Sequence, residues 1–265
     1  MTDSIALKPS IDLNADLGEG FPWDAELLGR VTSANVCCGA HAGDSDSIRE
    51  TLRIAKANGV VVGAHPGYPD RENFGRKAHA IGAEDVRALV LEQVSALCEL
   101  ADPLGIEIRY IKPHGALYNQ AQDDSNLAQG VVEAAHARGL PVVGLPGSHL
   151  EVVACQLGVR FVAEGFVDRG YDDRGRLLPR SAPDSVHHLL PAIETQTLAM
   201  VGGLRAHASV YEGGARNRSE RVSWHASWMR VETLCIHGDR KEALAIADAV
   251  RAILSRNGVA VRAFC

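Results

Sequence analysis

Short apolar runs alternate with longer amphipathic segments along almost the whole chain. The runs with the length and composition of β-strands, each bounded by turn residues, are 11–17, 34–40, 60–66, 108–114, 140–146, 160–168 and 232–238. Apolar residues recur at helical spacing in the segments 46–59, 82–100, 125–139 and 240–258. Strands that alternate with helices of this length indicate βαβ units and a parallel sheet.

Polar residues inside the strand-like runs repeatedly share one face. In the run 11–17, apolar residues at odd positions alternate with polar ones at even positions. The polar side chains on one parity are Asp12, Asn14 and Asp16, then Lys112 and His114, Glu164 and Asp168, and His237 and Asp239. An open parallel sheet has helices on both faces, so both should be apolar, whereas a barrel turns one face toward a lumen. We therefore predict a TIM-like (β/α)7-type barrel with a polar centre; an open doubly wound sheet is the alternative.

One region interrupts the alternation of predicted strands and helices. Residues 201–231 contain the turn-like stretch GGARNRSE between short alternating segments, so we predict an antiparallel β-hairpin inserted before the last βα unit. Trp224 and Trp228 are expected to pack in the core, with partner contacts as the alternative. Because no low-complexity segment or proline-rich linker occurs, we predict a single barrel domain over residues 1–265.

Composition narrows the class of protein. The chain has 265 residues, of which 46% are hydrophobic and 23% charged, and a net charge of -6. This charge argues against nucleic acid or an anionic membrane surface as the main partner. No run of about 18 apolar residues is present, so we expect no spanning helix. The segment MTDSIALKPS lacks the features of a signal peptide, and we expect a cytoplasmic protein.

The cysteines show no CxxC pairing or zinc-finger spacing; they are Cys37, Cys38, Cys98, Cys155, Cys235 and Cys265. Most lie in apolar runs, where we expect buried free thiols in a reducing compartment. A nucleophilic role for Cys37 or Cys38 is an alternative, although a buried thiol keeps a high pKa. Phosphate-binding loops of the GxxxxGK[ST] or GxGxxG type and GxSxG nucleophile elbows are missing from the sequence.

Ionisable side chains follow the predicted strands, at the end where α/β barrels build their active sites. They are Asp16 and Glu19; His41 and Asp44; His65, Tyr68 and Asp70; Lys112 and His114; Glu164, Asp168 and Arg169; and His237 and Asp239. A single histidine after a strand is usually a hydrogen-bonding residue, but so many strand ends with ionisable groups point to a reaction site. Within the first strand, we expect Asp12 to hydrogen-bond neighbouring strands, and Asp16 and Glu19 to lie nearer the chemistry.

Six blocks of sequence resemble the LamB/YcsF family. They read IDLNADLGEGF, VTSANVCCGAHAGD, VGAHPGYPDRENFGR, YIKPHGALYN, VAEGFVDRGYDDRGRLLPR and CIHGD, and they span residues 11–239. The resemblance implies an incomplete (β/α)7-type barrel of the glycoside hydrolase/deacetylase type. It also implies the activity of the A component of 5-oxoprolinase, which hydrolyses 5-oxo-L-proline to L-glutamate with ATP and partner subunits B and C. The sequence differs from typical members of the family in two places: the loop after Gly20 is shorter, and the segment 204–230 is longer and rich in Trp. These differences bear on the opening through which substrate enters and on the docking of partners.

The implied reaction suggests roles for the candidate residues. ATP with Mg²⁺ is the expected co-substrate, because phosphorylating the amide oxygen gives a reactive imidate that water can attack. This chemistry needs cations and a base. We expect Lys112 and Arg169 to stabilise phosphate or carboxylate charge, and Asp16 or Glu164 to act as the base. His114 is a further catalytic candidate; the candidates for substrate binding, besides Arg169, are Asp12, Asn14, Glu19, His41, His65, His237 and Asp239.

Other functions remain open at this point. Asp12 or Asp16 with His41 and His65 would supply the ligands of a divalent hydrolase site, although Mg²⁺ accompanying ATP is expected ahead of a permanent zinc ion. One alternative is therefore a stand-alone metal-dependent hydrolase or deacetylase of carbohydrate or amide substrates. Another is a non-catalytic binding protein, which fits the lack of a recognisable ATP loop. A homo-oligomer is compatible with each of these functions.

Overall fold

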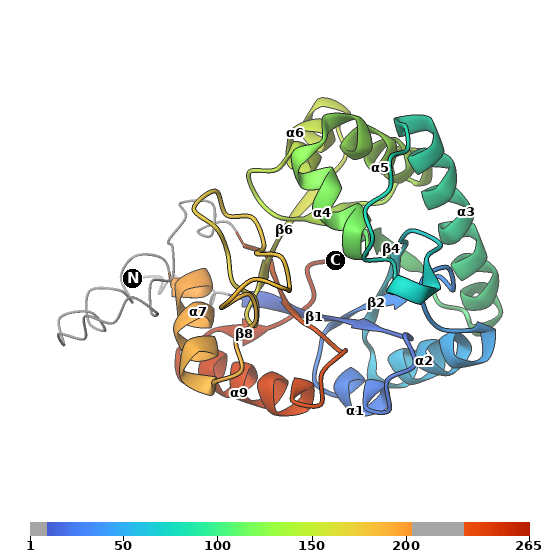
Figure 1. Cartoon of the computed structure of the whole chain (residues 1–265). Helices are drawn as coiled ribbons and strands as arrows, with labels where there is room; N and C mark the ends of the chain where they lie inside the picture. Colours follow the sequence, from blue (N-terminus) through green and yellow to red (C-terminus); the bar gives the residue numbers. More distant parts are fainter. Residues whose placement is uncertain (1–9, 203–230) are drawn as a thin grey trace, which may run out of the picture.

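The computed structural model describes residues 10–202 and 231–265 of the chain (Figure 1). The hairpin predicted at 201–231, including Trp224 and Trp228, lies almost entirely outside the described residues. The two described residues at its start, Val201 and Gly202, are instead the end of helix α7 (Leu190–Gly202).

Parallel strands close into a barrel. They are β1 (Ser10–Leu17), β2 (Ser33–Cys37), β3 (Val61–His65), β4 (Ile108–Ile111), β5 (Val142–Gly144), β6 (Phe161–Phe166) and β7 (Thr233–Ile236). Each pairs with the next along the chain, and β1 pairs with both β2 and β7, which completes the ring. The predicted barrel is confirmed and the open sheet is wrong. A short strand that was not predicted, β8 (Ala260–Val261), pairs with β1 at Ser10 and Ile11.

Helices surround this barrel on the outside (Figure 1). Those that correspond to predicted segments are α2 (Ser45–Asn58), α3 (Ala83–Ala101), α5 (Ser125–Arg138) and α9 (Ala243–Arg256). The sequence predicted no range for α1 (Asp24–Leu28), α4 (Gly115–Asp123), α6 (His149–Gln156) or α7. Single 3-10 turns occupy Arg71–Asn73 and Asp102–Leu104. In the described part of the chain, no helix has the length and apolar character required to cross a membrane.

Two of the candidate carboxylates act as helix caps. Asp44 accepts hydrogen bonds from the backbone N–H groups of Asp46 (3.0 Å) and Ser47 (2.8 Å), and so begins α2. Asp70 likewise accepts from the backbone N–H of Asn73 (3.4 Å), and also from its side chain (2.8 Å), at the first 3-10 turn. These contacts account for both residues structurally.

The lumen of the barrel changes from apolar to polar along its axis. One apolar cluster contains Tyr110, Val143 and Val162, with Val61 and Phe264 packed against it. Elsewhere in the lumen the strands carry polar side chains that hydrogen-bond one another. Buried polar groups of this kind must find partners, so they fix the register of the strands around the ring.

Asp12 is one of these lumen residues and joins three parts of the chain. Its carboxylate accepts hydrogen bonds from the hydroxyls of Thr32 (2.7 Å), Ser33 (2.7 Å) and Thr233. The expected hydrogen bonds between Asp12 and neighbouring strands are therefore present. Burial raises the pKa of Asp12, against the lowering effect of these hydroxyls.

Close packing of Tyr110 against β3 makes Gly63 a sensitive position. A Cβ atom at Gly63 would lie 2.2 Å from the Tyr110 ring, whose hydroxyl donates a hydrogen bond to Asn35 (2.7 Å) and so holds the ring in place. We expect Gly63→Ala to lower the free energy of unfolding by about 1–3 kcal/mol, measured by urea titration. Gly29→Ala, at an exposed helix end, is the matched control with an expected change within about 0.5 kcal/mol. Equal stability of the two variants would contradict this account.

Candidate active site

A cavity of about 370 Å³ opens at the end of the barrel where the strands terminate. Loops after β1, β3, β4, β6 and β7 contribute its walls, together with Tyr118 and Asn119 of α4. The predicted site residues that line it are Asp16, Glu19, His65, Lys112, His114, Arg169, His237 and Asp239. The other candidates, Asp12, Asn14, His41 and Glu164, are buried and do not line it. The barrel topology thus brings most of the predicted residues together.

Lys112 forms the positive centre of the cavity floor. Its Nζ lies 2.9 Å from Oδ1 of Asp16 and 2.7 Å from Oε1 of Glu164, and its side chain is only 2% exposed. Burial alone would lower the pKa of Lys112, but its anionic neighbours, Asp16 foremost, raise it well above its usual range. Lys112 is therefore a permanent buried cation between two carboxylates.

An amide network fixes this floor, and its central residue was not predicted. The Nδ2 group of Asn35 donates hydrogen bonds to Asn14 (2.7 Å) and to Oδ1 of Asp16 (2.8 Å). Asn14 in turn donates to Oε1 of Glu164 (3.1 Å). Asn35 lies in β2 between Ala34 and Val36, so the alternation used for β1 could have identified it.

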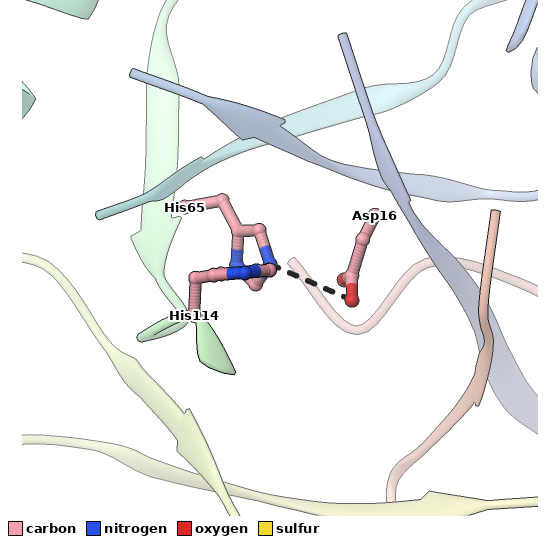
Figure 2. Close-up of side chains that lie close together, drawn as sticks. All are labelled: Asp16, His65 and His114. Carbon is pink, nitrogen blue, oxygen red and sulfur yellow. Dashed lines mark hydrogen bonds and ion pairs between the residues drawn. The ribbon is translucent and has the colours of Figure 1, made fainter. Parts of the chain in front are cut away.

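Three histidines lie beside Asp16. His65 Nδ1 is 2.8 Å from the backbone oxygen of Lys112, and His114 Nε2 is 2.8 Å from that of Phe74. The remaining nitrogens of these two rings, His65 Nε2 and His114 Nδ1, are 3.0 Å apart. The His41 ring stacks on His114 with a centroid distance of 3.8 Å. Figure 2 shows His65, His114 and Asp16 converging on one point.

Burial and mutual charge set the protonation of this group. Burial lowers the pKa of His41 to about 3, assisted by His65, and burial also lowers the pKa of His114. Burial opposes ionisation of Asp16, yet His65 and Lys112 outweigh it and hold the pKa well below its usual value. The pKa of Glu19 is raised by burial and by Asp16. At neutral pH an ionised Asp16 therefore lies beside neutral His41 and His114.

Two sets of side chains in the described residues have the geometry to hold a metal ion. They are Asp16, His65 and His114, and Glu19, His41 and His114, with ligand atoms within 4.8 Å of one another in each set. The structure thus joins Asp16 and His65 with His114, whereas the sequence grouped them with His41.

A second histidine–carboxylate pair lies just after the ends of β6 and β7, and its histidine lines the cavity. His237 Nδ1 is 2.9 Å from Asp168, which also lies 3.4 Å from Arg240. The His237 ring stacks on Phe166 at 5.2 Å. Because Nδ1 faces Asp168, Nε2 is the nitrogen available to the cavity that His237 lines.

Asp168 gives the fold a specific acid sensitivity. Burial alone would raise its pKa, but His237 and then Arg240 hold the pKa at about 2. A carboxyl with a depressed folded-state pKa stabilises the fold above its unfolded-state pKa of 3.8 and loses this contribution as the pH falls toward 2. We expect about 2 kcal/mol of stability to be lost in this window. Acid denaturation of Asp168→Asn, followed by circular dichroism, should be correspondingly shallower; curves parallel to the parent protein would contradict this.

The mouth of the cavity carries two cations that sequence reasoning missed. Arg76 Nη2 lies 2.5 Å and Arg180 Nη1 3.0 Å from the same Asp239 oxygen. Both arginines lie in loops without periodicity, so no pattern identified them. Arg169 donates instead to the backbone oxygens of Ser185 (3.0 Å) and Leu178 (2.7 Å), and so braces the loop that carries Arg180.

Cys37 and Cys38 do not have the features of catalytic nucleophiles. Cys37 and Cys38 do not line the cavity, and burial raises the pKa of Cys37 and brings that of Cys38 to about 12. All six cysteines are free, as expected. The expectation of burial is wrong for Cys155 and Cys265, which are exposed.

Comparison with known proteins agrees with this architecture. A family model described as the LamB/YcsF family matches residues 11–265. The crystal structure of a lactam utilization protein from Thermus thermophilus is 39% identical, with a TM-score of 0.80, over 96% of this chain and 100% of that one. A family 4 carbohydrate esterase from Streptomyces lividans, in complex with acetate, is 11% identical with a TM-score of 0.50, over 98% of this chain and 95% of that one, and shares the fold alone. The chain belongs to the LamB/YcsF family.

Proposed function

We propose that this chain is a hydrolase component that opens the cyclic amide of 5-oxo-L-proline to give L-glutamate. Family membership and the likeness to a lactam utilization protein support a role in lactam chemistry. The cavity of about 370 Å³ has a size suited to a small molecule. Its rim of Arg76 and Arg180 suits the carboxylate of such a substrate.

The observation that carries this proposal is the buried Lys112 on the cavity floor, at 2.9 Å from Asp16 and 2.7 Å from Glu164. A cation fixed in a low-dielectric site stabilises negative charge that develops on an amide or phosphoryl oxygen. The neighbouring carboxylates and hydrogen bonds hold it in position before the substrate arrives. This preorganisation is what an unreactive lactam requires.

ATP is the proposed co-substrate because opening the lactam ring is unfavourable without coupling. Transfer of the terminal phosphoryl group to the lactam oxygen releases ADP and forms an imidoyl phosphate. Water then adds to the ring carbon, the C–N bond breaks, and the nitrogen takes a proton to become the amino group of an acyl phosphate. A second water releases phosphate and leaves glutamate, so the sequence consumes one ATP and two waters.

The geometry assigns roles within this sequence of steps. Lys112 would stabilise charge on the lactam or phosphoryl oxygen. His237, oriented by Asp168, would accept a proton from water through Nε2 and later return it to the ring nitrogen. Asp16 lines the cavity and Glu164 lies outside its lining, so Asp16 is the carboxylate placed to contact substrate. In this scheme Glu164 acts through Lys112.

The nucleotide and the partner chains complete the proposal. We propose that Mg²⁺ enters with ATP, whose phosphates it binds through oxygen ligands. Partner subunits B and C would contribute to the phosphoryl transfer or to nucleotide binding, because this sequence contains no phosphate-binding loop of a standard type.

A second candidate function is hydrolysis of an amide or acetyl ester by a bound metal ion, without ATP. The convergence of Asp16, His65 and His114 favours it. A non-catalytic binding role is the remaining alternative.

One experiment separates these functions. The purified chain is incubated with 5-oxoproline and ATP, with and without subunits B and C, and glutamate is measured. Glutamate that requires ATP and all three chains supports the proposal. Turnover of acetylated sugars without ATP would support the second function, and ligand binding without any turnover would support the third.

A further inference from the structure

Hydrogen bonds to backbone carbonyls define which nitrogens of His65 and His114 carry a proton. Carbonyl oxygens only accept, so Nδ1 of His65 donates to the Lys112 carbonyl and Nε2 of His114 donates to the Phe74 carbonyl. In the neutral rings, the other nitrogens then carry lone pairs. Those two nitrogens, His65 Nε2 and His114 Nδ1, face each other at 3.0 Å. Two lone pairs at this distance repel unless a positive species lies between or beside them.

Asp16 adds a third acceptor to the same point. Its Oδ1 is occupied by Asn35 (2.8 Å) and Lys112 (2.9 Å), whereas Oδ2 lies 3.5 Å from His65 Nε2. Glu19 Oε1 lies 3.4 Å from His114 Nδ1. The geometry therefore directs acceptor atoms of Asp16, His65 and His114 toward one point (Figure 2).

From this convergence of lone pairs we infer that Asp16 Oδ2, His65 Nε2 and His114 Nδ1 form a binding site for one divalent transition-metal ion, of which Zn²⁺ is the leading candidate. Ligand atoms about 2.1 Å from one ion at angles near 90–110° are about 3.0–3.5 Å apart. The observed separations of 3.0 Å and 3.5 Å match this range. Two imidazoles with one carboxylate suit zinc, cobalt or iron better than Mg²⁺, which prefers oxygen ligands.

A proton is the competing occupant: on either ring it would account for the 3.0 Å between His65 Nε2 and His114 Nδ1, but not for the distance to Asp16. A charge-assisted N–H···O bond from a protonated His65 to Asp16 should be about 2.7–2.9 Å long, whereas the atoms are 3.5 Å apart. The carbonyl partners also match the outer-shell hydrogen bonds that orient metal-binding histidines. An ion held here would activate water or polarise a carbonyl next to Lys112.

Metal uptake without substrate tests the inference. Chelator-treated protein is titrated with Zn²⁺ by calorimetry and with Co²⁺ by visible absorption. We expect saturation at about one ion per chain. The visible absorption of bound Co²⁺ should be that of an ion with nitrogen ligands. We expect Asp16→Asn and His114→Gln to weaken binding roughly 100-fold or more. The asparagine amide can donate to His65 Nε2, so Asp16→Asn should stay folded by circular dichroism.

Control variants assign the ligands. His41→Gln tests the alternative set with Glu19, and His136→Gln, on the exposed surface of α5, tests non-specific binding. Both should retain uptake within about threefold. Three results would each overturn the assigned site. The parent protein could show no saturable metal binding, or Asp16→Asn could bind the metal as tightly as the parent. The third is a loss of metal affinity in His41→Gln equal to the loss in Asp16→Asn. Because the readout is ion binding, a chain that takes up the ion but opens no lactam would overturn the proposed function alone.

Discussion

Replacing Lys112 with methionine is expected to abolish lactam opening and to destabilise the fold. Methionine keeps most of the side-chain volume but leaves Asp16 and Glu164 without their shared cation, in a site where the lysine is 2% exposed. Removing one partner of a buried ion pair costs about 3–5 kcal/mol. Loss of a preorganised charge near the reacting oxygen lowers kcat by roughly 10²–10³ or more. Urea unfolding and glutamate release with all three subunits measure the two effects.

A second substitution separates the two consequences. Adding Glu164→Gln to Lys112→Met removes one uncompensated carboxylate, so part of the lost stability should return while activity stays low. Lys241→Met, at a side chain that is 84% exposed, is the matched control and should change neither. Full coupled activity of Lys112→Met would contradict the role of the lysine; unchanged stability would contradict the account of the buried ion pair.

Replacing His237 with glutamine is expected to lower kcat by roughly 10²–10⁴ with little change in KM. Glutamine can still hydrogen-bond Asp168, but it cannot accept and return a proton at Nε2. Stability should fall by no more than about 2 kcal/mol, because glutamine keeps a hydrogen bond to Asp168 and the Asp168–Arg240 contact at 3.4 Å remains. Steady-state kinetics with 5-oxoproline and ATP measure the effect.

The exposed His136 provides the comparison for this variant, and His136→Gln should retain parent kinetics. A higher KM at unchanged kcat in His237→Gln would assign that histidine to substrate binding instead. Activity equal to the parent protein would remove it from the reaction altogether.

The fold was predictable because the barrel imposes a regular constraint on the sequence. Only a lumen explains why Asp12, Asn14 and Asp16 occupy alternate positions of a strand whose other face is apolar. The helices that escaped prediction had weaker signals. The helix α6 spans only His149–Gln156, and α4 begins at Gly115, with a φ of 55°, shortly after β4 ends at Ile111. From the local sequence alone, a glycine at this position predicts a turn and not the start of a helix.

The sequence predicted which residues form the candidate site better than it predicted which of them contact one another. Strand ends identified Asp16, His65 and Lys112, because parallel strands bring their ends together at one mouth. The sequence could not reveal that Arg169 braces a loop or that Arg76 and Arg180 meet at the mouth. Loop residues have no period, and their contacts depend on the path of the loop in three dimensions.

The seam between β1 and β7 has a consequence for how the molecule assembles. Thr233 donates its hydroxyl hydrogen bond to Asp12 across 221 residues of sequence. Pairing of such distant strands pays a large loop-closure entropy, so ring closure is expected to be a late and slow step of folding. Until it occurs, the polar lumen is open to water, and Asp16 of β1 and His237 just after β7 lie at opposite edges of an open sheet. The reaction centre is thus a product of the final closure, and folding kinetics determine when the chain first becomes able to react.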